Sequence, residues 1–441
     1  MATIVFAVTN HIGHLNASYK LAADLRPAGH RVAYWSGDVG VAHAASWGFE
    51  AENVSFFALR DGVVPRLAAL PSARALAREL EAAVPRVPEA AAALVARWKP
   101  DLLIFDPFLL CFFPAFHALA VPAVAINEKP LLDADPQVPP YTSTVVPRTG
   151  WRGRVQTLAA RAYWHMRYMQ FVAVSNLQDV FVGASAHRMW RRLGHQANFP
   201  VERHWLRRPA PFDFCLRNVP ELVLFGSELE LPRSKQLRPQ VHYVGPCTSL
   251  ERPEPPWSWE ALDLRKYVIL CALGTVKAGR GRTAHRFLRR VIAAFADDPN
   301  VSLIMAVGDP DMAAQLDAAA NNVHVFASVP QLKILARADV MITHGGANSI
   351  KECIGSGVPP LVYPARADQP GNSARVLYHG IGLRGSRRWD TPRQIRRKVM
   401  RLIDDDAIRR NLARMRESFA RYHDVDYATL LEYARGAGMS P

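Results

Sequence analysis

The chain has 441 residues, a length that predicts two or three domains rather than a single core. Hydrophobic residues make up 49% and charged residues 21%, which is typical of globular proteins and excludes a disordered or fibrous chain. The net charge is +15, and residues 148–208 contain eleven arginines, two acidic residues and interleaved aromatic residues. That segment is either a solvated basic helical face or a surface for an anionic membrane, and no nucleic-acid-binding motif accompanies it.

The five cysteines are odd in number and scattered, with no C-x-x-C pair, so neither a disulfide framework nor a zinc site is expected. We predict reduced, buried thiols and a cytoplasmic location, with peripheral membrane contact through the basic segment as the alternative. The N-terminus lacks the basic region and apolar run of a signal peptide. Leu102–Ile126 has the length of a membrane span, but Asp106 and three prolines favour a buried strand, a helix and a second buried strand.

The first half of the chain begins with a β-α-β pattern. A strand over Thr3–Thr9 precedes a loop with His11 and His14, a helix from about Asn16 to Ala28, and a strand over Arg31–Trp35. The two strands are expected to be parallel neighbours. Later strands of this half are predicted over Asp101–Phe105, Val121–Asn127, Leu222–Phe225 and Val241–Val244, while 148–208 is predicted to be helical.

A proline-rich stretch at Ser249–Pro256 predicts a linker, after which the α/β pattern restarts. Strands are predicted over Tyr267–Ala272, Val301–Val307, Val323–Phe326, Val340–Thr343 and Pro360–Tyr363, and helices over Thr283–Phe295, from Leu332, and over Ala347–Gly355. We therefore predict an α/β protein with two doubly wound Rossmann-like domains facing a cleft. The expected boundaries are 1–247, a linker at 248–262, a second domain at 263–425, and a tail at 426–441 that packs back on the first domain.

The segment after the predicted strand Val340–Thr343 predicts an anion site. It reads His344-Gly345-Gly346-Ala347-Asn348-Ser349 and leads into a helix. The glycines let the backbone approach a ligand closely, and the helix N-terminus presents unpaired N–H groups. A diphosphate suits such a site, although a tight strand–helix turn alone would also contain two glycines. Glu352 lies one helical turn beyond Asn348, where it could accept hydrogen bonds from a ribose.

A longer pattern around this segment resembles a known family signature. It comprises Pro330-Gln331, His344-Gly345-Gly346, Asn348-Ser349, Glu352, Gly357-Val358-Pro359 and Asp368-Gln369. It is similar to the signature of the two-Rossmann-domain (GT-B) glycosyltransferases that include UDP-glycosyltransferases and bacterial macrolide and carotenoid glycosyltransferases. The resemblance implies a nucleotide-sugar site with phosphate contacts at His344, Gly346, Asn348 and Ser349, ribose at Glu352, donor sugar at Asp368 and Gln369, a phosphate- and sugar-facing loop at Gly274-Thr275, and the nucleotide base near Ser328, Val329 and Gln331.

The first half carries the rest of the resemblance. Gly13-His14-Leu15-Asn16 and Gly29-His30-Arg31-Val32 look like the family's opening motif, which implies that His14 is the catalytic base; His11 is the rival. The strand that ends at Asp106 resembles the one that carries the acidic partner of the base. Acceptors usually bind where the resemblance is weak, at 40–95 and 130–215. Leu109–Phe116 and the aromatic residues of 148–208 are expected to line or guard the acceptor side.

The resemblance implies an inverting transfer of a sugar from a nucleotide-diphosphate donor to a hydroxyl of a small, largely apolar acceptor, of the natural-product or lipid-like kind. No cofactor beyond the donor and no metal are expected, because the Asp-x-Asp segments at 133–135, 309–311 and 404–406 lie at turns or helix starts, where acids cap helix ends. Many members have a tryptophan where this chain has Ser328, so UDP and dTDP both stay open. A sugar-nucleotide epimerase or hydrolase of the same fold, and a binding protein without catalysis, are the alternatives.

Overall fold

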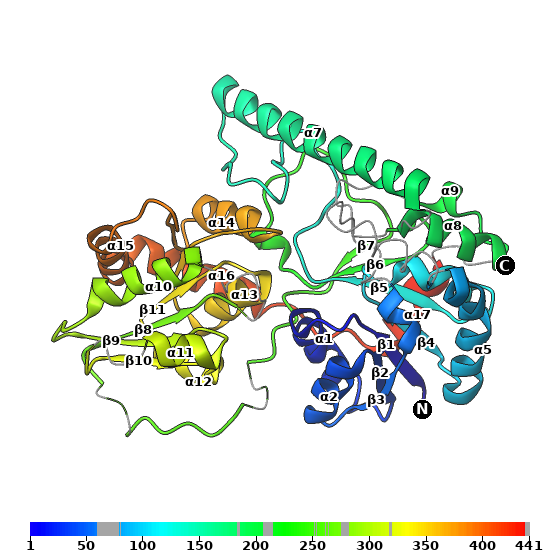
Figure 1. Cartoon of the computed structure of the whole chain (residues 1–441), viewed down its shortest axis with the longest axis horizontal. Helices are drawn as coiled ribbons and strands as arrows, with labels where there is room; N and C mark the ends of the chain where they lie inside the picture. Colours follow the sequence, from blue (N-terminus) through cyan, green and yellow to red (C-terminus); the bar gives the residue numbers. More distant parts are fainter. Residues whose placement is uncertain are drawn as a thin grey trace.

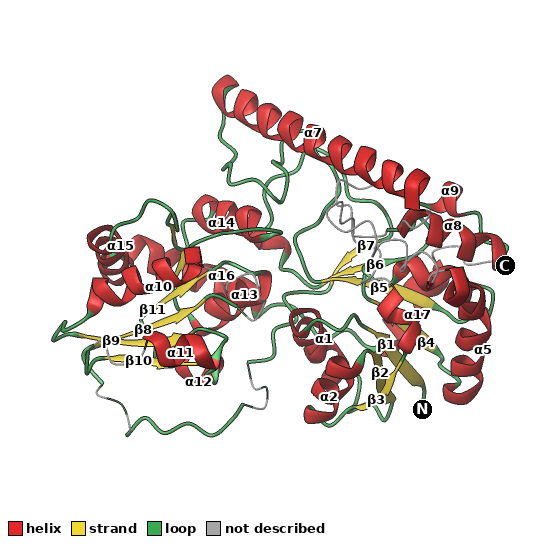
Figure 2. Cartoon of the chain, in the orientation of Figure 1, coloured by secondary structure: helices red, strands yellow, loops and turns green. Residues whose placement is uncertain are grey.

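The computed structural model describes residues 1–59, 79, 81–182, 186–205, 215–250, 252, 254–260, 262, 264–274, 282–316 and 320–436. The chain forms two lobes, each built on a parallel β-sheet with helices on its faces (Figures 1 and 2). The prediction of two parallel-sheet α/β domains is confirmed.

The N-terminal lobe contains a seven-stranded sheet in the order β3-β2-β1-β4-β5-β6-β7, in which all paired strands are parallel. The strands are β1 (Thr3–Ala7), β2 (Arg31–Ser36), β3 (Glu50–Asn53), β4 (Leu102–Phe105), β5 (Ala123–Asn127), β6 (Glu221–Val223) and β7 (Val241–Tyr243). The helices described are α1 (Ile12–Asp24), α2 (Asp38–Ser46), α5 (Val87–Trp98), α6 (Phe113–His117), α7 (Trp151–Val182), α8 (Ala186–Gln196) and α9 (Val201–His204), with short 3-10 turns η1 (Ser55–Phe57), η2 (Val84–Arg86), η3 (Leu110–Phe112) and η4 (Ser227–Leu229).

The C-terminal lobe contains a six-stranded parallel sheet in the order β10-β9-β8-β11-β12-β13. Its strands are β8 (Tyr267–Ala272), β9 (Val301–Ala306), β10 (Val323–Phe326), β11 (Val340–Thr343), β12 (Pro360–Val362) and β13 (Leu383–Arg384). The helices described after β7 are α10 (Arg282–Phe295), α11 (Pro310–Leu316), α12 (Gln331–Leu335), α13 (Ala347–Ser356), α14 (Gln369–Tyr378), α15 (Pro392–Asp404), α16 (Asp406–Phe419) and α17 (Tyr427–Gly436).

The apolar stretch Leu102–Ile126 forms β4, short helical turns and β5, as predicted, and its strands are completely buried. Within the described residues, no helix is both long enough and apolar enough to cross a membrane. All five cysteines are buried, as predicted, and none of them forms a disulfide.

Helix α1 begins four residues earlier than predicted. His11 is its N-cap in an extended conformation, so Gly13 and His14 lie in the first helical turn rather than in a loop. The backbone N–H of His14 donates to the carbonyl of His11 at 3.0 Å. The helix starts directly after β1 because a β-α unit in a parallel sheet needs only a short turn. His14 is thereby held at the carboxyl end of the sheet.

Helix α17 follows the C-terminal lobe in sequence but packs on the N-terminal lobe (Figure 1). Leu430 and Ala434 are completely buried in the cluster that contains Ile4, Tyr19 and Leu222. The chain therefore crosses between the lobes twice, once before β8 and once after α16.

Truncating Leu430 should destabilise the protein. Leu430→Ala removes a fully buried side chain from the cluster under β1 and β5, for which core Leu→Ala changes cost about 2–5 kcal/mol. Denaturant unfolding followed by circular dichroism measures the loss. The matched control is Leu237→Ala, whose side chain is 43% exposed and should unfold like the unmodified protein. Equal stability of the two variants would contradict the packing of α17.

Candidate active site

The carboxyl ends of strands from both sheets meet between the lobes. Helices α1 and α13, which follow β1 and β11, contact each other there (Figure 1). The side-chain amide of Asn348 donates to the carbonyl of Gly13 at 2.7 Å, and Nζ of Lys351 donates to the carbonyl of Leu224 at 2.9 Å. Ligands bind at this edge of doubly wound sheets, so the predicted residues of the two halves face one region.

His14 and Asp106 form a close pair, 92 positions apart in sequence. Nδ1 of His14 lies 2.7 Å from Oδ2 of Asp106, whose side chain is fully buried at the end of β4. The other Asp106 oxygen accepts from the backbone N–H of Phe108 at 2.7 Å. Because Nδ1 faces a carboxylate it carries the ring proton, and Nε2 is left as the basic atom. In contrast, Nδ1 of His11 faces the hydroxyl of Thr9 at 3.1 Å.

A second carboxylate next to His14 was missed by sequence reasoning. Glu128 follows β5, is 5% exposed, and places Oε1 3.2 Å from Nδ1 of His14. Nζ of Lys129 lies 3.2 Å from the same oxygen and 4.4 Å from the centre of the Phe108 ring, which in turn packs on His14. The only available signal was a charged pair directly after a buried strand.

The surrounding charges set the protonation of this pair. Burial alone would lower the pKa of His14, but the carboxylates of Asp106 and Glu128 outweigh it, so the pKa is raised above 6.5. Burial would raise the pKa of Asp106, whereas His14 and the N–H of Phe108 bring it below the usual value. Asp106 therefore stays ionised near neutral pH, and His14 is a stronger base than a free imidazole.

The turn after β11 is as tight as its two glycines predicted. Gly345 has φ +84, and a Cβ there would lie 2.4 Å from Cγ1 of Val362. A Cβ on Gly346, the N-cap of α13, would lie 2.7 Å from Nε2 of His344. Gly274, in the loop that follows β8, has φ +83, and a Cβ on it would lie 2.8 Å from the His344 ring. Gly274 and Gly346 thus leave the space that the His344 ring fills, while Gly345 leaves space for Val362. Thr275 lies outside the described residues.

His344 is neutral in this setting. Burial, followed by the positive charges of Arg387 and Arg366, lowers its pKa to about 4. The same positive charges, together with the N-terminus of α13, favour an anion beside the ring. His344 can donate a single N–H to such an anion but adds no positive charge to it.

Glu352 is buried and already has partners for both carboxylate oxygens. Arg252 of the linker donates to Oε1, and the side-chain amide of Gln331 donates to Oε2. An ionised carboxylate accepts about four hydrogen bonds, so capacity for hydroxyl donors is left. The linker is itself fixed on this lobe, because Glu254 accepts from the backbone N–H groups of Leu332 and Lys333, both at 2.9 Å. Arg252 and Glu254 were not foreseen from the sequence.

Asp368 and Gln369 lie at the start of α14, next to α13. Oδ2 of Asp368 accepts from the backbone N–H of Ala347 at 3.2 Å and from the amide of Asn372 at 2.7 Å. Burial raises the pKa of Asp368, and the positive charge of Lys129 from the other lobe opposes this rise. Oε1 of Gln369 accepts from the backbone of Ala365 and Arg366, which closes the loop after β12.

The remaining predicted positions lie at the margin of the site. Ser328 is exposed and Val329 half-buried, in the loop between β10 and α12. Ser349 is half-buried in the first turn of α13. The ring of Phe326 packs edge-on against Trp257 of the linker at 5.1 Å, so this aromatic side chain is used inside the lobe.

Two expectations need correction or refinement. Leu109–Phe116 does not line an acceptor pocket: its large apolar side chains are at most 2% exposed and form the core with Trp35 and Trp190. The run is hydrophobic because it fills the core behind β4, and Phe108 just before it is the ring that reaches His14.

The Asp-x-Asp segments brace local structure: Asp135 accepts from Ser234 and Lys235, and Asp309 and Asp405 accept from the N–H groups of α11 and α16.

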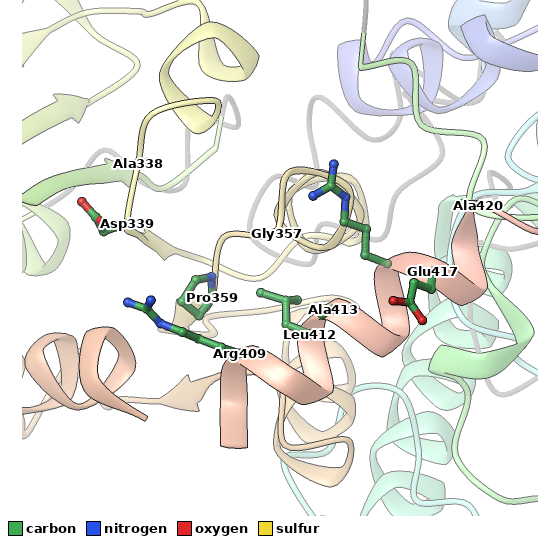
Figure 3. Close-up of a pocket in the computed structure, with 10 residues that line it drawn as sticks. Ala338, Asp339, Gly357, Pro359, Arg409, Leu412, Ala413, Glu417 and Ala420 are labelled. Atoms are coloured by element: carbon green, nitrogen blue, oxygen red, sulfur yellow. The ribbon is translucent and has the colours of Figure 1, made fainter. Parts of the chain in front are cut away.

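A hollow of about 530 Å³ lies elsewhere in the C-terminal lobe (Figure 3). It is bordered by the start of β11, the end of α13 and one side of α16, with Arg409 and Glu417 among its side chains. This is the amino end of β11, opposite the turn that holds His344. The hollow is therefore separate from the candidate active site.

The chain is similar in sequence to several known proteins. Residues 295–423 match the family described as Erythromycin biosynthesis protein CIII-like, C-terminal domain. The chain is 32% identical over 230 residues to 4′-demethylrebeccamycin synthase of Lentzea aerocolonigenes, which covers 51% of this chain and 52% of that relative. It is 25% identical to oleandomycin glycosyltransferase of Streptomyces antibioticus, covering 95% and 86% of the two chains, and to zeaxanthin glucosyltransferase of Pseudescherichia vulneris, covering 92% and 91%.

Solved structures show the same fold. The glycotransferase of kitacinnamycin superposes with a TM-score of 0.70 at 22% identity, covering 100% of this chain and 99% of that chain. The glycosyltransferase VinC in complex with DTDP superposes with a TM-score of 0.60 at 17% identity, covering 98% and 100%. Both superpositions span the two lobes, so the whole chain has the architecture of these proteins.

The raised pKa of His14 can be tested by NMR titration of the imidazole. We expect a midpoint above 6.5 in the unmodified protein and a lower midpoint in Asp106→Asn, which removes the hydrogen-bonded carboxylate. Glu128→Gln should lower the midpoint by a smaller amount, because the Asp106 charge contributes more and also accepts the hydrogen bond. A His14 midpoint that is the same in all three proteins would contradict the pairing.

Arg252→Met should destabilise the C-terminal lobe, because it leaves Glu352 buried with one ionic partner removed; breaking such pairs costs about 3–5 kcal/mol. Arg252→Met combined with Glu352→Gln should recover part of that loss, since the charge is removed with its partner. A double-mutant cycle of unfolding free energies measures the coupling. Additive effects of the two changes would show that the ion pair does not form.

Proposed function

We propose that the chain is a nucleotide-sugar-dependent glycosyltransferase with two Rossmann-like domains, and that it transfers a sugar with inversion from a nucleoside-diphosphate donor to a hydroxyl group. One observation carries this proposal. The His14–Asp106 pair of one lobe faces the glycine turn and the α13 N-terminus of the other lobe. The hydrogen bond from the Asn348 side chain to the carbonyl of Gly13 joins the two lobes at this point. A base and an anion site on opposite sides of one region are what a direct displacement needs.

The proposed base is Nε2 of His14. It removes the proton of the acceptor hydroxyl while the oxygen attacks the anomeric carbon. Asp106 holds Nδ1–H, fixes the ring orientation and stabilises the imidazolium that forms. Glu128 adds a second negative charge beside the same nitrogen and supports the raised pKa. The acceptor proton ends on His14, and no covalent sugar–enzyme intermediate is required.

The leaving group is proposed to depart from the side of α13. As the bond from the anomeric carbon to the diphosphate oxygen breaks, negative charge develops on the nucleoside diphosphate. The N-terminus of α13, the N–H of neutral His344, and the charges of Arg366 and Arg387 lie where they can stabilise it. Because the three Asp-x-Asp segments brace local structure, we propose that these protein groups, and not a metal held by such a segment, bind the diphosphate.

The other predicted residues are assigned to the ribose, the sugar and the base of the donor. We propose that Glu352, oriented by Arg252 and Gln331, accepts the ribose hydroxyls, and that Asp368 and Gln369 bind the sugar. The loop with Ser328 and Val329 would border the base. We propose either UDP or dTDP as the nucleotide of the donor. The structural neighbour VinC was solved in complex with DTDP. The relatives named for oleandomycin and zeaxanthin are glycosyltransferases.

We propose a small, largely apolar acceptor of the natural-product or lipid-like kind, in line with the compounds in the relatives' names. Phe108, packed on His14, offers an apolar surface next to the base. An anionic membrane is proposed as a further, peripheral partner of the 148–208 region.

His14→Ala should reduce transfer by about 10²–10⁴-fold, the usual contribution of a general base, while donor binding is retained. Mass spectrometry of the glycosylated product measures the rate, and a thermal shift with UDP- and dTDP-sugars measures binding. His11→Ala is the matched control and should keep most of the activity. Full transfer by His14→Ala would remove His14 as the base, and donor consumption at the same rate without acceptor would favour a hydrolase.

A further inference from the structure

The long helix α7 has an exposed apolar face. Seven of the thirteen large hydrophobic side chains that are exposed in the described part of the chain belong to this one helix. They are Trp151, Val155, Leu158, Tyr163, Met166, Met169 and Leu177. Trp151 is 70% exposed. Figure 1 shows α7 running along one edge of the molecule, outside both sheets.

Six of these side chains share one side of the helix. With 3.6 residues per turn, Trp151, Val155, Leu158, Met166, Met169 and Leu177 fall within a sector about 100° wide, which we call the outer stripe. The opposite side is the one that packs on the protein: Thr157 is 3% exposed, and Arg161 donates to the carbonyls of Asp135 and Val138. The outer stripe is thus an additional apolar face on a helix whose inner side is already packed.

Positive charge accompanies the outer stripe. Arg152, Arg154 and Arg167 are exposed on α7, and the guanidinium of Arg152 lies 5.4 Å from the centre of the Trp151 ring. The sequence from Trp151 to Gln178 contains no acidic residue. An apolar stripe with arginines and an aromatic ring at its borders is the composition of helices that lie in a membrane interface.

We propose that α7 docks flat on an anionic lipid bilayer, with the outer stripe in the acyl boundary and the arginines at the headgroups. The helix is about 48 Å long. A second copy of the chain fits less well, because pairing two such helices would bring like charges together. Nucleic acid fits less well because it offers no apolar surface for the outer stripe. An acidic protein partner would meet the charge, but no vesicle binding would then be observed.

Docking through α7 would place the candidate site beside the bilayer. The segment that leads into α7 borders α14, the helix that begins at Gln369. The carbonyl of Tyr141 accepts from the N–H of Gly371 at 2.8 Å, and the carbonyl of Thr144 accepts from Arg384. Gly371 lies two residues after Gln369 on α14. An amphiphilic alcohol dissolved in the membrane could therefore reach the site along this edge. This extension to a membrane-dissolved acceptor rests on the proposed glycosyl transfer, whereas the docking itself does not.

The test is co-sedimentation of the full chain with vesicles of phosphatidylcholine, with and without phosphatidylglycerol, at low and high salt. We expect binding that requires phosphatidylglycerol and weakens with salt. The variant V155Q/L158Q/M166Q/M169Q should lose at least tenfold in vesicle partitioning. R152Q/R154Q/R167Q should lose the dependence on phosphatidylglycerol. The matched control, L237Q/W389Q, changes exposed hydrophobic residues outside α7 and should bind like the unmodified chain.

Equal binding by the stripe variant and the control would overturn the proposal, as would the absence of binding by the unmodified chain. Sedimentation velocity provides a further check: a dimer that dissociates in the stripe variant, without vesicle binding, would assign α7 to a second copy. Transfer to a water-soluble acceptor without vesicles is measured in parallel, and the stripe variant should keep it. Loss of vesicle binding with intact transfer separates this proposal from the proposed function.

Discussion

The contact between the N-termini of α1 and α13 is the constraint on which the candidate site depends. His14 belongs to one lobe and the glycine turn at His344 to the other, so neither lobe alone holds both. The hydrogen bond from Asn348 to Gly13 joins these turns directly. Lys351, buried between the lobes with a pKa lowered by burial to about 8, adds a bond to the carbonyl of Leu224. The reacting groups are therefore positioned by the docking of two sheets rather than by one loop.

Charge is arranged differently on the two sides of this contact. On the side of His14, Asp106 and Glu128 raise the pKa of the imidazole and make it a better base. On the side of His344, burial and two arginines keep that imidazole neutral and leave the surroundings positive. One lobe is thus suited to accept a proton and the other to accept a departing anion. Lys129, which belongs to the first lobe but acts on Asp368, connects the two settings.

Local sequence patterns predicted the strands of both sheets except the edge strands β3 and β13, because buried parallel strands are apolar runs. They also predicted the glycine turn, because a turn of this tightness excludes Cβ atoms. The long-range partners could not be read in this way. Glu128, Arg252 and Asn372 act on residues that are distant in sequence, and the only local signal among them was the charged pair Glu128-Lys129 directly after a buried strand. The run Leu109–Phe116 was misjudged for a related reason: apolarity predicts burial but does not distinguish a core from a ligand pocket.

The central claim is a direct displacement at the anomeric carbon by a hydroxyl activated at His14. The most direct measurement is the anomeric configuration of the sugar in the product, determined by NMR from a reaction with a donor of known configuration and a small apolar alcohol. We predict a glycoside with inverted configuration, formed together with one nucleoside diphosphate per sugar. A product with retained configuration, or release of free sugar at the same rate without the alcohol, would contradict it.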